Sequence, residues 1–162
     1  MTRGQLTLST TLFLAFLAAV ATGFAVGTQG TFTSRAGGIV DPLRVSFFVH
    51  IGGTFSAGLL LGLVALRAGP GFTLGYSGPV IPYTYIAGTL GVFIIMGIAF
   101  AFPTIGLTAG QAAFLLGQML IAIIVDTAGL AGRDGIPLDL RRIAGLVLLA
   151  AAAWLLLPRD TG

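Results

Sequence analysis

The sequence predicts an all-α integral membrane protein with five transmembrane helices. Three observations support this fold class: 56% of the 162 residues are hydrophobic, 8% are charged, and the mean hydropathy is +1.04. Soluble domains carry about 25% charged residues. A chain with so few charges would not stay soluble, so we expect a bilayer around it. Residues 1–162 are expected to form a single membrane domain.

Each predicted helix is an apolar segment near the roughly 20 residues that cross a hydrocarbon core. The first lies near 6–27; it also resembles a secretory signal peptide, with AVA at 19–21, but we interpret it as a transmembrane helix. The second lies near 43–66, after the loop TSRAGGIVDP. Glycine and proline mark such connections because they interrupt helices.

The third and fourth segments lie near 83–102 and 105–126, after the Gly/Pro-rich loop RAGPGFTLGYSGPVIP. Pro103 alone separates them, which predicts a tight helical hairpin. The fifth lies near 142–157, after GRDGIPLDLRR, the most charged stretch of the chain. No soluble domain is expected beside the helices.

The charged residues exclude several classes of function. All eight basic residues are arginines, scattered singly or as one pair, so no clustered nucleic-acid surface is expected. Cysteine is absent and there is one histidine, which leaves too few ligands for a metal site. There are no paired carboxylates and no Ser–His motif, so we predict that the protein is not an enzyme and uses no cofactor.

The arginines give a weak orientation signal. Five spans place the two termini on opposite sides of the membrane. The N-terminal side then holds Arg3, Arg67, Arg133, Arg141 and Arg142, and the other side Arg35, Arg44 and Arg159. This slight excess has two interpretations under the positive-inside rule: a cytoplasmic N-terminus, or insertion both ways with pairing to an inverted copy.

Small residues recur four apart in most segments. The pairs are Gly23 and Gly27, Gly58 and Gly62, Ala87 and Gly91, and Gly106 and Gly110. Such spacing allows close helix packing in lipid. It predicts a tightly packed bundle with little room for a large cofactor, and ordinary packing explains it without any function.

Polar residues within the apolar segments are the candidate functional residues, since they are costly there. Gln29 follows the first segment, His50 lies in the second, and Gln111 and Gln118 share a face of the fourth. We expect His50 and Gln111 at similar depth and Gln118 near the midplane. Each is open to two interpretations, an interhelical hydrogen bond or a contact with a substrate.

Asp126 is placed where an anion is disfavoured, because the C-terminal end of a helix carries partial negative charge. An ion pair with Arg133, Arg141 or Arg142 would offset this field. In a monomer His50 and Asp126 are expected about 20 Å apart in depth. An inverted second subunit would bring them closer, so a gating function for Asp126 is also open.

The stretch GQMLIAIIVDTAGLAG, followed by IPLDLRRIAGLVLL, resembles the YdcZ-like family of the drug/metabolite transporter superfamily. The matching positions are Gly117, Gln118, Asp126, Gly129, Pro137, Arg141, Arg142 and Gly145. AGTLGVF, PTIGLTAGQAAFLLGQ, Gln29 and SFFVHIGGTF fit other family elements. Thr33 and Thr127 stand where the family often has Asn and His, and His50 matches no family position.

The resemblance implies a five-helix protomer that exports a small molecule as an antiparallel dimer with itself or a paralogue. We therefore predict a transporter of a small metabolite or organic cation in the bacterial inner membrane. An inverted second subunit would complete this half-transporter, which would work by alternating access. Gln118, Gln29, Tyr83 and Tyr85 would line the cavity, and His50 would be the titrating group.

The residues Gly117, Gly129, Gln111 and Asp126 are assigned structural or gating functions. A carboxylate near the midplane, which would suit a proton-coupled exporter of cations, is missing from the sequence. This favours a neutral substrate or coupling through His50. The alternative function is a non-transporting accessory subunit packed into a larger membrane complex.

Overall fold

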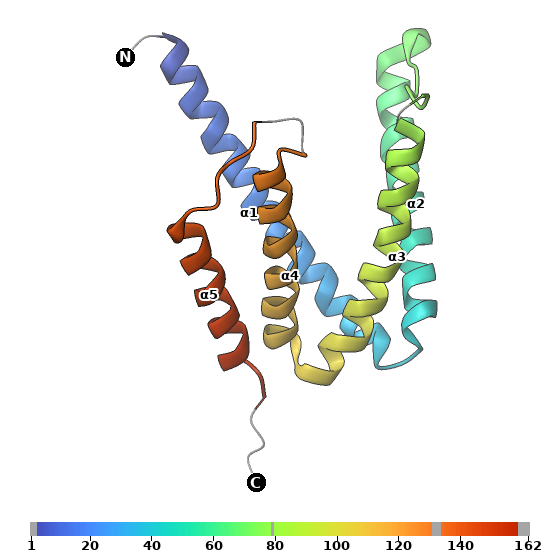
Figure 1. Ribbon diagram of the computed structural model, residues 1–162. Helices are drawn as coiled ribbons and strands as arrows, with labels where there is room; N and C mark the ends of the chain where they lie inside the picture. The colour runs from blue at the N-terminus through green and yellow to red at the C-terminus, as the bar shows by residue number, and fades with distance from the viewer. Residues whose placement is uncertain (1–2, 79, 131–133, 159–162) are drawn as a thin grey trace.

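The computed structural model describes residues 3–78, 80–130 and 134–158, with side chains in the first helix from residue 10 onward. The described residues form five α-helices and one short 3-10 turn, and they contain no strand. The helices are α1 (Arg3–Gly37), α2 (Pro42–Ala68), α3 (Val80–Ile105), α4 (Leu107–Ala128) and α5 (Leu140–Leu155); the turn η1 (Gly69–Gly71) follows α2. Successive helices run in opposite directions, so α1 begins and α5 ends at opposite ends of the molecule (Figure 1).

The first helix is longer than expected. α1 continues to Gly37, so Gln29, which we predicted beyond the helix, lies within it. No glycine pair or proline interrupts the chain before Gly37 and Gly38, and the hydroxyls of Thr28 and Thr31 donate to carbonyls one turn back. Its 35 residues measure about 52 Å. This exceeds the bilayer core, and α1 crosses the others obliquely (Figure 1).

The hairpin between α3 and α4 is present, but its turn is not at Pro103. Pro103 lies in the last turn of α3, and Gly106, with a φ of 85°, forms the turn. Glycine suits this position because it adopts positive φ without a Cβ clash. Proline near the end of a helix removes one hydrogen bond but leaves the helix continuous there. The prediction of a hairpin is confirmed, and the assignment of its breakpoint was wrong.

Among the described residues, the four helices α1 to α4 are long and apolar enough to cross a membrane. α5 has 16 residues and measures about 24 Å, less than a hydrocarbon core of about 30 Å. Asp139 caps its first turn by accepting a hydrogen bond from the backbone N–H of Arg142. A fifth crossing therefore stays a prediction, which local thinning of the bilayer would permit.

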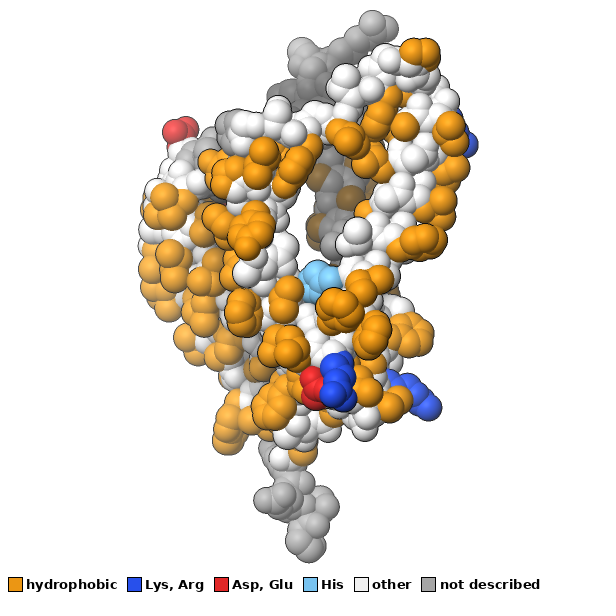
Figure 2. Space-filling view, turned by 90° about the vertical axis from the view of Figure 1, so that its right-hand side faces the viewer, with side chains coloured by type: hydrophobic (Ala, Val, Ile, Leu, Met, Phe, Trp, Pro, Cys, Tyr) orange, Lys and Arg blue, Asp and Glu red, His pale blue; other side chains and the backbone are white. Residues whose placement is uncertain are grey.

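The protomer has a small core where α1, α2 and α3 meet near the α1–α2 turn. Val45, Ile95 and Ala99 are buried there, and Ala36 and Val49 pack against them. α5 contacts α4 and no other described helix. Most other large apolar side chains are exposed, as the orange surface of Figure 2 shows. This is expected where lipid, rather than water, surrounds the helices.

Candidate functional site

A mainly apolar pocket with three polar side chains lies between α1, α2 and α3. It encloses about 440 Å³ and is lined by Gln29, Val49, His50, Gly53, Thr54, Ala57, Gly91, Ile94 and Ile95. Figure 2 shows the histidine, in pale blue, beside a hollow in this face of the molecule. The structure thus brings together two predicted site residues, Gln29 and His50, from different helices.

His50 is held in place by its own helix. Its Nδ1 lies 2.8 Å from the carbonyl oxygen of Ser46, one turn earlier in α2. Ser46 is fully buried, and its hydroxyl donates to the carbonyl of Val92 in α3 at 2.9 Å. This bond fixes α2 against α3, so the imidazole is oriented by a rigid helix contact. Its other nitrogen, Nε2, faces Gly91.

The pocket lining contains no Asp, Glu, Lys or Arg side chain, so a formal charge can arise only by protonation of His50. Among the lining residues, the polar side chains are Gln29, His50 and Thr54. Within the described residues, no group of three or more His, Asp or Glu side chains could hold a metal ion. The arrangement therefore suits hydrogen bonding to a small molecule, in a cavity of the size typical for such ligands.

Gln111 approaches the opposite side of α1. Its Oε1 would lie 3.7 Å from a Cβ atom added to Gly30, and it lines a cavity of about 420 Å³ that Gly27 also lines. Gln111 therefore lies near the part of α1 that carries Gln29, but the two side chains line separate cavities. Within one protomer the structure does not join them into one site.

Gln118 and Gly117 lie in a third, larger cavity of about 1030 Å³ between α3 and α4. Its other lining side chains are apolar, and they include Phe93, Phe102 and Phe114. Gln118 is exposed within the protomer. The lining of this groove offers the Gln118 amide no other polar side chain, so polar partners for it would have to come from another chain.

Tyr83 and Tyr85 line none of these cavities. They are 72% and 75% exposed in the first turns of α3. The nearby Tyr76 hydroxyl accepts a hydrogen bond from the hydroxyl of Thr84 at 3.1 Å. Exposed tyrosines at a helix end are typical of the membrane–water interface. The structure therefore does not bring this tyrosine pair to Gln29 and His50.

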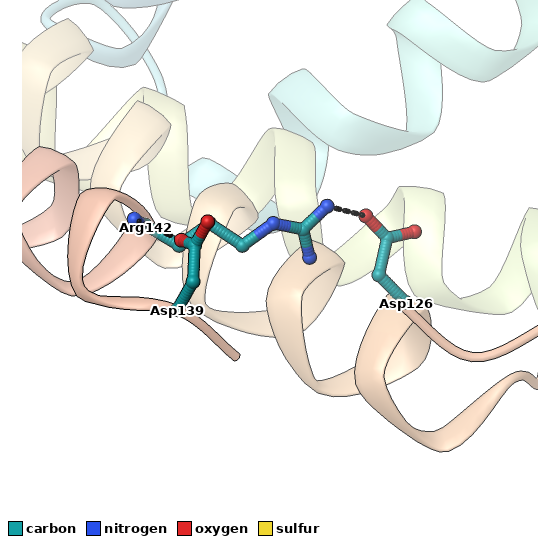
Figure 3. A network of polar contacts seen from close by, with 3 residues as sticks. All are labelled: Asp126, Asp139 and Arg142. Carbon is teal, nitrogen blue, oxygen red and sulfur yellow. Dashed lines mark hydrogen bonds and ion pairs between the residues drawn. The ribbon is translucent and has the colours of Figure 1, made fainter. Parts of the chain in front are cut away.

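Asp126 pairs with Arg142, one of the three arginines proposed for it. Asp126 Oδ2 lies 3.5 Å from Nη2 of Arg142 (Figure 3). The backbone carbonyl of Asp126 accepts hydrogen bonds from the N–H groups of Gly129 and Ile136. Gly129 has a φ of 65°, which ends α4 in a left-handed cap. Arg133 lies outside the described residues.

We expect this ion pair to contribute little, because both side chains are partly exposed. A double-mutant cycle with Asp126→Asn and Arg142→Gln should give a coupling free energy of about 0.2–1 kcal/mol. It is measured from unfolding of the purified protein at low and at high salt, and the coupling should shrink with salt. A coupling of zero at low salt would show that the pair does not form.

Most glycines of the pairs spaced four apart make no close contact with another helix. The close contacts lie mainly at other glycines. A Cβ atom at Gly23, Gly27, Gly58 or Gly62 would meet nothing within 4 Å. By contrast, Gly37 contacts Ala99, Gly91 contacts His50, and Gly30 and Gly110 both contact the ring of Phe102. Sequence reasoning missed Gly30, Gly37 and Phe102, because single glycines outside a repeat carry no spacing signal.

Comparison with known proteins identifies the family. Residues 14–155 match the model of the family described as "Putative inner membrane exporter, YdcZ". No curated protein and no solved structure matches the chain. The match covers most of the chain: it begins within α1 and includes all of α2, α3 and α4 and the pocket between α1, α2 and α3. The chain therefore belongs to this YdcZ family and is a multi-pass protein of the inner membrane.

Proposed function

We propose that the protein exports a small metabolite or organic cation, and that the pocket of Gln29 and His50 is part of the substrate path. The observation that carries this proposal is the pocket itself: it lies between three helices and brings the polar side chains of Gln29, His50 and Thr54 together, in a chain whose family is described as a putative exporter. Polar side chains held inside a membrane bundle are retained mainly for function.

Two inverted copies of the chain complete the transporter in this proposal. The protomer exposes 12496 Å², whereas a compact monomer of 16.5 kDa exposes about 7,500 Å². This excess of about 5,000 Å² per protomer is larger than the roughly 1,000–2,500 Å² that each partner of an obligate dimer buries, so a second copy would cover part of it and lipid the rest. The near-even arginine count on the two sides supports insertion in both orientations.

In the dimer, the apolar groove with Gln118 faces the partner, and the two subunits rock about the shared cavity. Rocking of inverted repeats around a central site gives alternating access in many transporters. The unpartnered glycines of α1 and α2, which meet nothing within 4 Å in the protomer, suit such a second interface. Asp126, with Gly129 and Arg142, would hold the end of α4 during this motion.

Replacing His50 tests whether it couples transport to protons. In everted membrane vesicles, we expect His50→Ala to abolish the pH dependence of export, because no other titratable side chain lines the pocket. The assay follows substrate-induced collapse of an imposed pH gradient, with a panel of small metabolites and organic cations. Gly88→Ala is the control, since a Cβ there meets nothing within 4 Å. Undiminished pH dependence in His50→Ala would exclude coupling through this residue.

Purification distinguishes the alternative function, an accessory subunit of a larger complex. A stable two-copy assembly isolated from the membrane supports the exporter. Recovery of the chain only together with other subunits, and with no export activity, supports the accessory function instead.

A further inference from the structure

The hydrogen bond from His50 to Ser46 determines which imidazole nitrogen carries a proton. A backbone carbonyl oxygen can only accept, so Nδ1, at 2.8 Å from the Ser46 oxygen, must be the donor. A neutral imidazole has one N–H. Its Nε2 therefore has a lone pair and acts as an acceptor.

This acceptor atom lies at the pocket wall and is not occupied by the protein. Nε2 would be 3.0 Å from a Cβ atom at Gly91, so the missing side chain of that glycine keeps the approach to Nε2 open. Within the described residues, no donor is recorded in a hydrogen bond with Nε2. The imidazole is half-buried, and Nε2 stays accessible from the pocket to an incoming donor.

The rest of the lining restricts what that incoming group can be. Gln29 from α1 and Thr54 from α2 add an amide and a hydroxyl, and the remaining lining side chains are apolar or absent. No lysine, arginine or other cation lines the pocket to receive an anion. Carboxylates and phosphates are disfavoured while the imidazole is neutral, because a negative group would then meet the Nε2 lone pair.

We propose that this pocket binds a small amine or alcohol, which donates an N–H or O–H hydrogen bond to Nε2 of His50. The proposal rests on the proposed function and names the substrate class of that same site. The volume of about 440 Å³ fits a molecule of a few non-hydrogen atoms up to metabolite size.

Protonation of His50 at Nε2 would oppose binding of the amine or alcohol. Once Nε2 gains a proton it becomes a donor and can no longer accept from the ligand. The groups that face His50 are Gln29 from α1, Thr54 from α2, and Gly91 and Ile94 from α3, and none of them titrates. The neutral imidazole should therefore bind an amine or alcohol more tightly than the imidazolium.

The single histidine makes the first test direct. In the full-length protein in lipid nanodiscs, proton–nitrogen NMR of the labelled imidazole reports which nitrogen is protonated. We expect the Nδ1–H form at alkaline pH. Observation of the Nε2–H form would overturn the proposal, because Nε2 would then be a donor.

Isomeric ligands test the required donor. The first pair is n-butylammonium and tetramethylammonium, which share formula and charge but differ in N–H groups; the second is n-butanol and diethyl ether, which differ in the O–H. We expect saturable changes in the His50 signal with the donor of each pair and none with its isomer. Equal responses within each pair, or no response to either donor, would overturn the proposal.

Gly91→Ala is the matched variant, since its methyl group would stand about 3.0 Å from Nε2 without removing the imidazole. We expect about tenfold weaker binding of n-butylammonium, the loss of one hydrogen bond. Gly88→Ala, on the same helix, should bind normally. Export without donor binding would refute this site but keep the exporter, whereas donor binding without export would refute the exporter but keep the site.

Discussion

Replacing Gly37 with alanine should lower the free energy of unfolding by about 1–3 kcal/mol or more. Gly37 is the last residue of α1, and it lies directly against the backbone carbonyl of Ala99 in α3. A methyl group at this position would overlap that carbonyl. Because the obstacle is backbone rather than a flexible side chain, relief requires α1 and α3 to move apart.

The sequence explains why this carbonyl is approached so closely. Pro103, four residues after Ala99, has no N–H, so the Ala99 oxygen lacks its helical donor. The backbone of Gly37 lies against this oxygen, where an added Cβ atom would overlap it. Small residues are needed wherever helix backbones approach this closely in a membrane.

Gly38→Ala is the control for Gly37→Ala, because a Cβ there would make an ordinary contact, 3.5 Å from the Arg35 carbonyl. Both variants are unfolded in parallel with denaturant in the same lipid–detergent mixture. The contact between α1 and α3 is not as described if the two variants unfold at the same midpoint.

Replacing Gly110 with alanine is expected to have the second large effect, a loss of about 1–3 kcal/mol. A Cβ at Gly110 would lie 2.5 Å from Cδ1 of Phe102, and the other edge of the ring lies 2.9 Å from the Cβ position of Gly30. The ring is 3% exposed and is held between α1 and α4. It cannot rotate away from one glycine without approaching the other.

A second substitution separates this clash from a general effect of alanine. Phe102→Leu combined with Gly110→Ala should recover part of the lost free energy, because leucine vacates the space that the ring edge occupies. Gly117→Ala, on the same helix, meets nothing within 4 Å and should be neutral or slightly stabilising. Failure of the double variant to recover would contradict the packing of Phe102 between the two glycines.

The sequence predicts the helices of this fold better than their contacts. Hydropathy locates all five helices, and the Gly/Pro-rich loops locate their ends to within a few residues, except for α1. The end of α1 was missed because Gln29 and the threonines after it resemble a loop in composition. Within the helix these threonines donate to their own backbone, so their polarity does not interrupt it.

The candidate site was predictable only in part. Polarity at membrane depth singles out Gln29 and His50, and the structure places both in one pocket. Gln118 and Tyr83 lie away from this pocket because of the way each helix is rotated about its axis. The polarity of a residue alone does not determine this rotation. The free Nε2 of His50 depends on a bond to Ser46 and on the absent side chain of Gly91, two features without a sequence signature.

The central claim is that the protomer is half of an exporter and is completed by an inverted copy. The chain has no cysteine, so Gly162→Cys provides one unique label. Intact cells are treated with a membrane-impermeant maleimide, and the labelled fraction is measured before and after permeabilisation. We expect about half of the molecules to be labelled from outside, because the proposed inverted homodimer requires equal numbers in the two orientations. Labelling of all molecules or of none would show a single orientation and contradict the inverted homodimer.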